Sequence, residues 1–417
     1  MLSTMKYCLF ILSFVLVSCI QEEETGLAPV SPSRTVLVYM AADNSLSEET
    51  AQKIEALRQG WRRTGSKCLI YVDTPDGARL LRLRGGCQTA PTPYVETIAE
   101  YGLENSASAA VFGRVIRDVT AAYPAESYGL IFFSHASGWL PAGTLQNPAR
   151  TVPETPGMLT SLTAPGTRSV GQDDGVDTPD GIGHAGMELS EFSAAIPDGL
   201  FDFIVFEACL MAGVEVAYAL REKTDYILAS SAEIVSPGFT PIYRSASWHL
   251  SDTSKSVEES LTVFGKAYLN HVNEQSGDRC SATLSLVAAK ELTLLAVRTR
   301  DLLAGQPLHR SDIISCLQHF DRPGSYGDSP AVARYLDMGD WAQQTGKPEQ
   351  YTALEEQLKR TVRWAASTKR FLPSQNGFEI RRHSGLTVYA EQPELPTLNA
   401  YYHSTGWYKA VSENQTN

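Results

Sequence analysis

Five apolar runs along the chain predict buried strands. They are rich in Val, Ile, Leu, Phe and Tyr and lie at 35–41, 67–72, 128–134, 202–208 and 225–231. Continuous apolar runs of this length are typical of strands in a mostly parallel sheet, because both faces of such a sheet are covered.

Helical patterns separate these runs, at 48–60, 109–123, 188–196 and 212–223. Strand–helix alternation predicts an α/β sandwich with helices on both faces of the sheet. After about residue 250 the pattern continues with a helix, a strand at 281–288, a further helix and a late strand at 386–390. No Pro/Ser-rich linker interrupts it, so we expect a core over 34–250 and a C-terminal part of the same unit over 251–417.

The first residues read as a targeting segment. Lys6 precedes an apolar run at 8–17, too short for a stable bilayer-spanning helix, and the run leads to Cys19 in a sequence that resembles a bacterial lipobox. We therefore predict a lipoprotein signal peptide at 1–18, lipid attachment at Cys19 and an acidic, Pro-containing tether at 19–33. An ordinary signal peptide cut nearby is the alternative.

The tether also bears on localisation. Its three glutamates at 22–24 resemble surface-export signals of Gram-negative lipoproteins, with a plain spacer as the alternative. We expect a cell-envelope lipoprotein, at the outer membrane or the cell surface, whose only contact with the membrane is its lipid anchor.

Composition narrows the function classes. In 417 residues, 43% are hydrophobic, which permits a large core and argues against a disordered or fibrous chain. Lys and Arg number 35 against 47 Asp and Glu, a net charge of −12, which disfavours nucleic-acid binding and suits basic substrates.

The cysteines exclude some classes of site and leave others open. Seven cysteines without a C-x-x-C pair argue against a structural zinc site and against a disulfide scaffold. A bridge between Cys68 and Cys87 stays open in an oxidising compartment. The five cysteines beyond the signal leave at least one free thiol.

One segment breaks the alternation. Residues 139–170 are rich in Pro, Gly, Thr and Ala without apolar periodicity, which is typical of a functional or disordered loop. An acidic turn follows, in which Asp173, Asp174 and Asp177 are candidates for Ca²⁺ ligands. A solvated turn is the alternative, since the spacing is not that of an EF-hand.

Two predicted strands end in reactive side chains. The strand at 128–134 leads into His135, and the strand at 202–208 leads into Cys209, just before a predicted helix. Sites in open α/β sheets lie beyond the carboxyl ends of strands. A helix start favours thiolate, and a neighbouring histidine can act as its base, so the pair suits nucleophilic catalysis. A buried core cysteine and an ordinary histidine are the alternative.

The residues around them add a resemblance. The blocks YGLIFFSHASGW and FDFIVFEACLMAGVEVAYAL, with LVYMAADNSL, MELSEF, ASSAEIVSPGF, YLDMGDW and GLTVYAEQ, resemble the clostripain family of cysteine endopeptidases, relatives of caspases, gingipains and legumains. The resemblance implies a caspase-like three-layer α/β sandwich, His135 as base, Cys209 as nucleophile and cleavage of proteins or peptides after Arg or Lys. The backbone of Cys209 and Ala136 would bind the oxyanion, and no cofactor is required.

Two positions depart from the family pattern. Ala136 stands where the family commonly has Gly, which would be strained if the backbone there has a positive φ. Glu207 stands where the family usually has Asp, whose charge lies near the pocket for the basic side chain. We expect Glu207 to bind the substrate's basic residue; a structural salt bridge is the alternative, and a catalytically weak or inactive surface lipoprotein is the alternative function.

Some members of the family cut themselves between the His and Cys blocks. Here the interval from 136 to 208 holds two candidates, Arg150 and Arg168, and no lysine. Both lie in the irregular segment, where exposed backbone can enter a protease cleft. An intact loop is the alternative.

Overall fold

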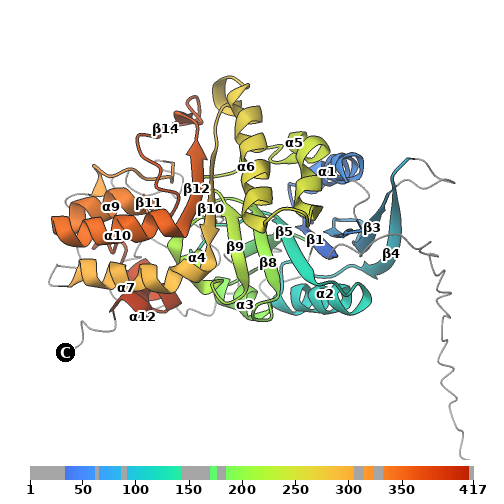
Figure 1. The fold of residues 1–417 in the computed structure, drawn as a ribbon, viewed down its shortest axis with the longest axis horizontal. Helices are drawn as coiled ribbons and strands as arrows, with labels where there is room; N and C mark the ends of the chain where they lie inside the picture. Colours follow the sequence, from blue (N-terminus) through green and yellow to red (C-terminus); the bar gives the residue numbers. More distant parts are fainter. Residues whose placement is uncertain are drawn as a thin grey trace, which may run out of the picture. The chain divides into compact units, whose positions relative to one another are not determined.

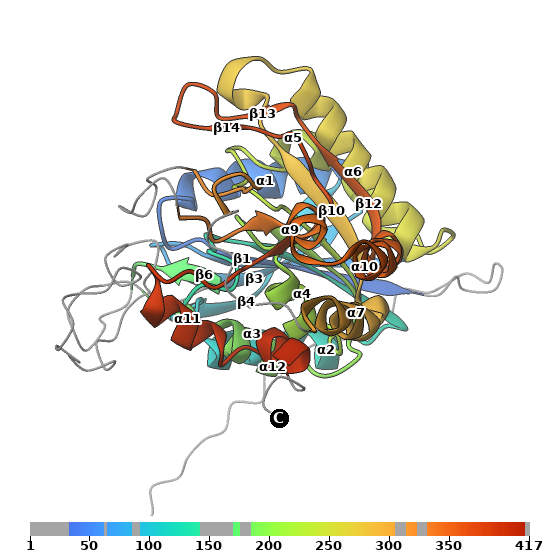
Figure 2. The same cartoon turned by 90° about the vertical axis from the view of Figure 1, so that its left-hand side faces the viewer.

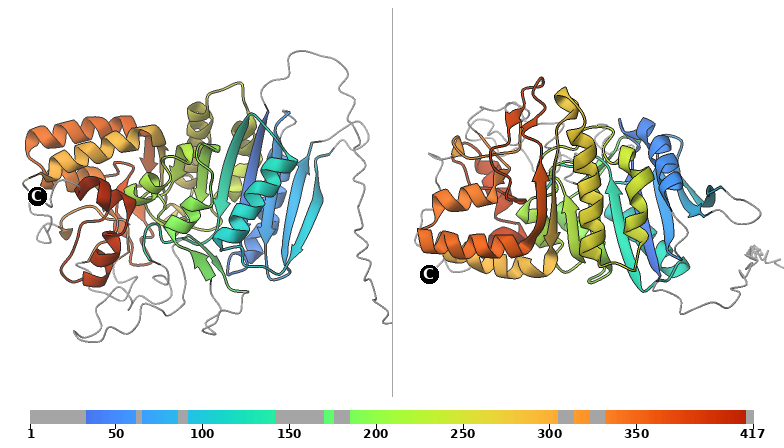
Figure 3. Two further views of the ribbon diagram at one scale, coloured as in Figure 1. Left: turned by 90° about the horizontal axis from the view of Figure 1, so that it is seen from below. Right: turned by 45° about the horizontal axis from the view of Figure 1, so that its top comes forward.

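The computed structural model describes residues 33–61, 65–85, 92–141, 170–175, 185–304, 314–322 and 332–412. These residues belong to one compact unit. Its centre is a nine-stranded sheet with the order β12-β10-β9-β8-β5-β1-β2-β3-β4. Figure 1 and Figure 3 show this sheet running from the blue strands at one edge to the orange strand at the other.

The five strands in the middle of the sheet are parallel. They are β1 (Arg34–Ala41), β2 (Lys67–Asp73), β5 (Ser127–Phe133), β8 (Phe201–Glu207) and β9 (Thr224–Ala229). All five coincide with the predicted apolar runs to within two residues at each end, so the predicted α/β fold with its mostly parallel centre is confirmed.

Both edges of the sheet are antiparallel, which the sequence patterns did not predict. One edge is β3 (Ala78–Arg84) and β4 (Tyr94–Gly102), and the other is β10 (Thr283–Ala288) and β12 (Val362–Ser367). Of these only β10 was expected. The strands β3, β4 and β12 carry charged residues between apolar ones, as in ARLLRLR of β3, and so lack the continuous apolar run that marks a central strand.

Helices cover both faces of the sheet (Figure 2). Helices α1 (Ser47–Gly60), α5 (Thr240–Ala246) and α6 (Val257–Asn273) pack on one face through a shared apolar core. On the other face lie α2 (Ala109–Ala122), α3 (Leu189–Ala194) and α4 (Val214–Ala219). The result is the three-layer sandwich that strand–helix alternation predicts.

Local chemistry explains the start of these helices. Ser108 caps α2 by accepting a hydrogen bond from the backbone N–H of Val111, and Ser256 caps α6 in a reciprocal box with Glu259. In α2 the residues that face the core recur every three or four positions, as a helix requires. They are Phe112, Val115, Ile116 and Val119.

The C-terminal third adds β10 and β12 to the sheet and a helical group beside it. The helices are α7 (Leu292–Leu303), α9 (Met338–Thr345), α10 (Pro348–Thr361), α11 (Pro396–Tyr402) and α12 (Gly406–Ser412). The predicted strand at 386–390 is only β15 (Thr387–Val388), which pairs with β11 (Leu336–Asp337) outside the central sheet. Its apolar residues are buried by these helices rather than by sheet neighbours.

The remaining elements are short. Strand β6 (Val170–Asp173) pairs with β7 (Ala185–Met187), and β13 (Arg370–Phe371) pairs with β14 (Phe378–Glu379). Short 3₁₀ helices in the described residues include η2 (Ser247–Ser251), η3 (Gly277–Arg279) and η4 (Ala289–Glu291).

Candidate active site

Three neighbouring parallel strands carry the candidate site to one edge of the sheet. In the register of β1, β5 and β8, Met40 lies opposite Phe133, and Phe133 lies opposite Glu207. His135 and Cys209 each follow two residues after the paired positions of β5 and β8. The structure therefore places both predicted residues just beyond the carboxyl ends of adjacent strands, where sites of α/β sheets lie.

Cys209 lies in a strained turn between β8 and α4. Leu210, the next residue, has a φ of 63°, a left-handed conformation that costs a leucine about 1–3 kcal/mol. The backbone compensates, because the N–H of Leu210 donates to the carbonyl of Ala232 at 3.0 Å and that of Ala212 donates to Ser230 at 2.9 Å. The Cys209 Sγ accepts a hydrogen bond from the Ile234 N–H at 3.4 Å.

The helix after Cys209 is shorter and later than predicted. Helix α4 spans Val214–Ala219 instead of 212–223, so an irregular turn separates the thiol from its first turn. The helix-end charge acts only over the first turn. The expected thiolate stabilisation by this helix is therefore wrong.

The electrostatics favour an uncharged pair. Burial raises the pKa of the Cys209 thiol to about 12, and the charge of Glu233 adds to the rise, while the Ile234 N–H and Arg322 oppose it. Burial also lowers the pKa of His135, against the charges of Asp174 and Glu49. At neutral pH the resting site thus holds a thiol and a neutral imidazole, and the imidazole is free to accept a proton.

Ser45 holds the imidazole. Its Oγ lies 2.9 Å from Nε2 of His135, and the His135 carbonyl accepts a hydrogen bond from the Gly171 N–H at 3.0 Å. The side chain of Asn44 fixes the Ser45 loop by donating to the carbonyls of Ala41 and Gln172. The sequence patterns did not single out Ser45, although it follows β1, the strand beside β5.

The loops after β5 and β8 touch. Gly138 has a φ of 65°, and a Cβ there would lie 2.4 Å from the Leu210 carbonyl oxygen, so only glycine permits this approach. Tyr335 donates its hydroxyl to the Ser137 carbonyl at 2.6 Å. Ala136 is buried beside Val170 and is not among the residues with positive φ, so the strain considered at this position does not arise.

Glu207 is buried in the interior. Its Oε1 lies 2.6 Å from the Nζ of Lys53 and accepts a hydrogen bond from the Phe239 N–H, and its Oε2 accepts one from the Tyr243 hydroxyl. The side chains of Lys53 and Glu207 are 0% and 1% exposed. Glu207 thus has the structural salt-bridge role, and the expectation that it binds the substrate's basic residue is corrected.

Glu233, in contrast, lies beside the nucleophile and is accessible. Its two chain neighbours, Ala232 and Ile234, make the backbone contacts to Leu210 and Cys209 described above. Its Oε1 accepts hydrogen bonds from Nε and Nη2 of Arg322 at 3.1 and 3.0 Å, and the two side chains are 29% and 27% exposed. Ion pairs with this exposure contribute about 1 kcal/mol or less.

Other predicted residues lie elsewhere or outside the described ranges. Arg150, Arg168, Asp177 and Cys19 are among the residues that the structure does not describe, as is Cys87, while Cys68 is a free thiol buried in β2. The roles predicted for them stay predictions.

The calcium candidates are only partly described. The carboxylate of Asp173 is buried and accepts hydrogen bonds from the N–H and hydroxyl of Ser106 and from the Gly175 N–H. In the described residues, no group of three or more His, Cys, Asp or Glu side chains is arranged to hold a metal ion. Calcium binding stays a prediction that these contacts do not support.

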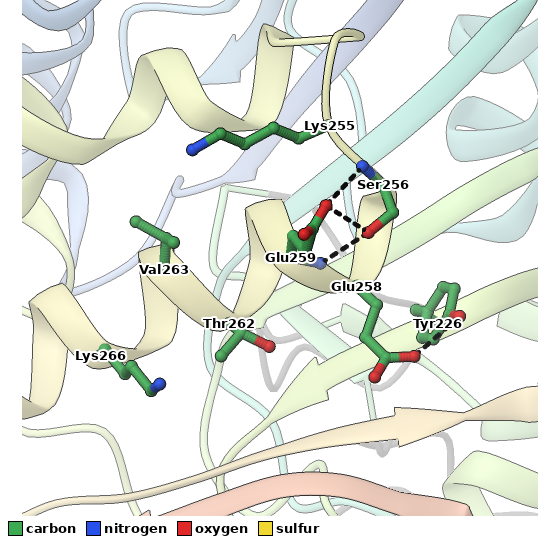
Figure 4. A pocket seen from close by; sticks show the side chains of 8 residues that line it. All are labelled: Tyr226, Lys255, Ser256, Glu258, Glu259, Thr262, Val263 and Lys266. Carbon is green, nitrogen blue, oxygen red and sulfur yellow. Dashed lines mark hydrogen bonds between the residues drawn. The ribbon is translucent and has the colours of Figure 1, made fainter.

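A separate surface hollow lies over the start of α6 (Figure 4). Lysines and glutamates of α6 and its cap, with Tyr226 of β9, line it. None of these residues comes from the loops after β1, β5 or β8, so the hollow is not part of the candidate site.

Known proteins resemble the chain in sequence and in fold. The sequence model described as the clostripain family matches residues 38–306, well over half of the chain. The chain belongs to the clostripain family. It is therefore a cysteine peptidase of caspase-like fold, as the resemblance implied.

Solved structures extend the likeness of this clostripain-family chain almost to its full length. An inactive zymogen C11 protease from Parabacteroides distasonis is 28% identical, with a TM-score of 0.73 over 92% of this chain and 99% of that one. A secreted C11 cysteine protease from Bacteroides thetaiotaomicron, in complex with an irreversible peptide inhibitor, is 26% identical, with a TM-score of 0.73 over 92% of this chain and 100% of that one. No curated protein matches the chain. Within the described residues, no helix has the length and apolarity to cross a membrane.

Proposed function

We propose that this clostripain-family peptidase is a lipid-anchored endopeptidase that cleaves after basic residues, with Cys209 as nucleophile and His135 as base. The observation that carries the proposal is the delivery of both side chains to one sheet edge by the adjacent strands β5 and β8. The net charge of −12 and an accessible carboxylate beside the thiol favour basic substrates.

The neutral resting pair suits a general-base mechanism. As Sγ of Cys209 attacks the scissile carbonyl, the proton of the thiol passes to His135, and the resulting imidazolium gives it to the departing amine. Backbone N–H groups at Cys209 and Ala136 are proposed to bind the oxyanion. Water, with His135 again as base, then hydrolyses the thioester and regenerates the thiol.

The anchor part of the proposal rests on the sequence around Cys19. Lipid on Cys19 would hold the peptidase at the outer membrane or the cell surface, with the acidic residues that follow as a tether. Mass analysis of the protein from its envelope fraction, beside Cys19→Ser, tests this. A lipid mass on the N-terminal peptide of wild type alone is expected, and an unmodified mature terminus in both would contradict it.

The substrate part is tested with fluorogenic peptides that differ only in the residue before the cut. We expect turnover after Arg and Lys to exceed turnover after norleucine or Glu by at least about tenfold, the effect of one charge-assisted contact. Turnover led by a neutral or acidic residue would contradict the proposed specificity. No turnover of any peptide, in a folded preparation whose thiol at Cys209 resists alkylation, would favour a non-catalytic binding module.

Ser45 gives a further prediction about the base. If Nε2 of His135 donates to Ser45, Nδ1 is left to exchange the proton with the thiol. Ser45→Ala should lower kcat/KM about fivefold, the effect of one hydrogen bond of about 1 kcal/mol. It should also lower the pKa of the histidine limb of the pH–rate profile, since the lost bond stabilises imidazolium more than imidazole.

Two controls accompany this variant. Ser45→Thr keeps the hydroxyl and should restore both the rate and the profile. Ser404→Ala removes an exposed hydroxyl that donates to the Tyr401 carbonyl, and it should change neither the rate nor the profile. An unchanged pH profile in Ser45→Ala would show that the hydroxyl does not orient His135.

A further inference from the structure

Two acids of this peptidase stand near Cys209 in sequence or in space, and their cations differ in accessibility. Glu207 holds the ammonium of Lys53 in the interior, where both side chains are essentially unexposed. Glu233 holds the guanidinium of Arg322 at the surface, where more than a quarter of each side chain is exposed. A substrate side chain can reach the second pair without opening the core, but not the first.

The position of Glu233 relative to the nucleophile is fixed by backbone contacts on both sides of it. The preceding carbonyl, of Ala232, accepts a hydrogen bond from Leu210, and the following N–H, of Ile234, donates to the sulfur of Cys209. The carboxylate is therefore attached to the same short segment that contacts the thiol. During cleavage, the carbonyl of the substrate residue before the scissile bond must lie at Cys209. The side chain of that same residue is therefore the substrate group that the Glu233 carboxylate can contact.

The guanidinium of Arg322 already shows which group fits. Nε and Nη2 both donate to the same carboxylate oxygen, Oε1 of Glu233, while the contact that Nη1 makes to a described residue is a long one, 3.4 Å to the Gln375 carbonyl. A planar group with several donors makes this double contact, whereas an ammonium offers one compact set of donors. The second oxygen of Glu233 has no hydrogen bond among the contacts described here.

We propose that Glu233 is the residue that selects arginine before the scissile bond, and that Arg322 occupies it in the resting enzyme until a substrate guanidinium takes its place. This inference rests on the proposed function. It assigns the basic preference to the segment after β9 instead of to Glu207, and it makes Arg322 an internal competitor of the substrate. Arginine is preferred over lysine because only the guanidinium reproduces the double contact.

The test compares Glu233→Gln, Arg322→Gln and the double variant on two peptides that differ only in Arg or norleucine before the cut. Glu233→Gln should lower the ratio of kcat/KM for the Arg peptide to kcat/KM for the norleucine peptide about ten- to hundredfold, because any change that the lost charge makes to the Cys209 thiol is common to both peptides. Arg322→Gln should lower KM for the Arg peptide about two- to fivefold relative to KM for the norleucine peptide, the effect of removing a partly exposed ion pair. The double variant should behave as Glu233→Gln.

Controls separate this inference from the function on which it rests. Arg298→Gln breaks a more exposed surface pair with Asp301 on α7, and it should change the kinetics of neither peptide. An enzyme that prefers Arg and keeps that preference in Glu233→Gln would overturn the inference while the function stands. Equal losses for both peptides in Arg322→Gln, with a lower melting temperature, would show a structural ion pair and would also overturn it. A wild-type enzyme without any preference for Arg would contradict the proposed function itself.

Discussion

Cys209→Ala is expected to abolish peptidase activity and to leave the fold intact. Without the sulfur no thioester forms, and losses on removing a catalytic nucleophile reach about 10⁴-fold or more in kcat. The side chain is half-buried and its sulfur accepts only the Ile234 N–H among the described contacts, so the free energy of unfolding should fall by about 1 kcal/mol at most. Initial rates on the best peptide and urea denaturation measure the two effects.

A matched control is Cys280→Ala, which removes another free, partly buried thiol, in the turn after η3. It should keep full activity. Turnover by Cys209→Ala above the background of a mock preparation would remove Cys209 as the nucleophile. Loss of activity in both variants would point to thiol-dependent stability instead.

Lys53→Met is expected to destabilise the protein by about 3–5 kcal/mol. The substitution leaves the buried carboxylate of Glu207 without its cation, and breaking one side of a buried ion pair typically costs this much. Lys53 also donates to the Pro237 carbonyl and the Thr240 hydroxyl, and its ammonium lies 4.4 Å from the centre of the Phe133 ring, so further contacts are lost. The loss should appear as a lower urea midpoint with an unchanged slope.

The double variant Lys53→Met with Glu207→Gln should recover part of this loss, because no charge then remains buried without a partner. The comparison is Lys359→Met, which breaks an exposed pair with Glu355 and should change stability by less than about 1 kcal/mol. Equal effects of Lys53→Met and Lys359→Met would mean that water reaches the Lys53 pair and that our account of the interior is wrong.

The central strands were predictable because burial on both faces leaves an unbroken apolar run in the sequence. The edge strands β3, β4 and β12 were not, because each keeps polar residues toward solvent and depends on its neighbour for pairing. The strand predicted at 386–390 was apolar for a different reason, since helices of the C-terminal third bury it. An apolar run in the sequence indicates that its residues are buried, but not whether strands or helices cover them.

At the site, His135 and Cys209 could be found because strand ends and flanking residues mark them. The ion-pair partners of the two carboxylates near Cys209 could not be found in this way. Glu207 and Lys53 are 154 positions apart, and Glu233 and Arg322 are 89 apart. The residues next to each carboxylate in the sequence do not indicate which one is neutralised in the core and which one faces solvent. The family pattern therefore favoured Glu207, whereas the packing in the structure favours Glu233.

The arrangement of β1, β5 and β8 also has a meaning for protein design. Ser45, His135 and Cys209 each follow one of three adjacent strands, whose relative placement is set by two register matches, Met40 with Phe133 and Phe133 with Glu207. A smaller scaffold that reproduces this three-stranded parallel unit, with its registers and the turns that follow the strands, would inherit the relative placement of the three side chains. The part of this enzyme that could be transferred to another scaffold is thus the hydrogen-bonded pairing of these three strands. Residues that determine substrate specificity could be added separately.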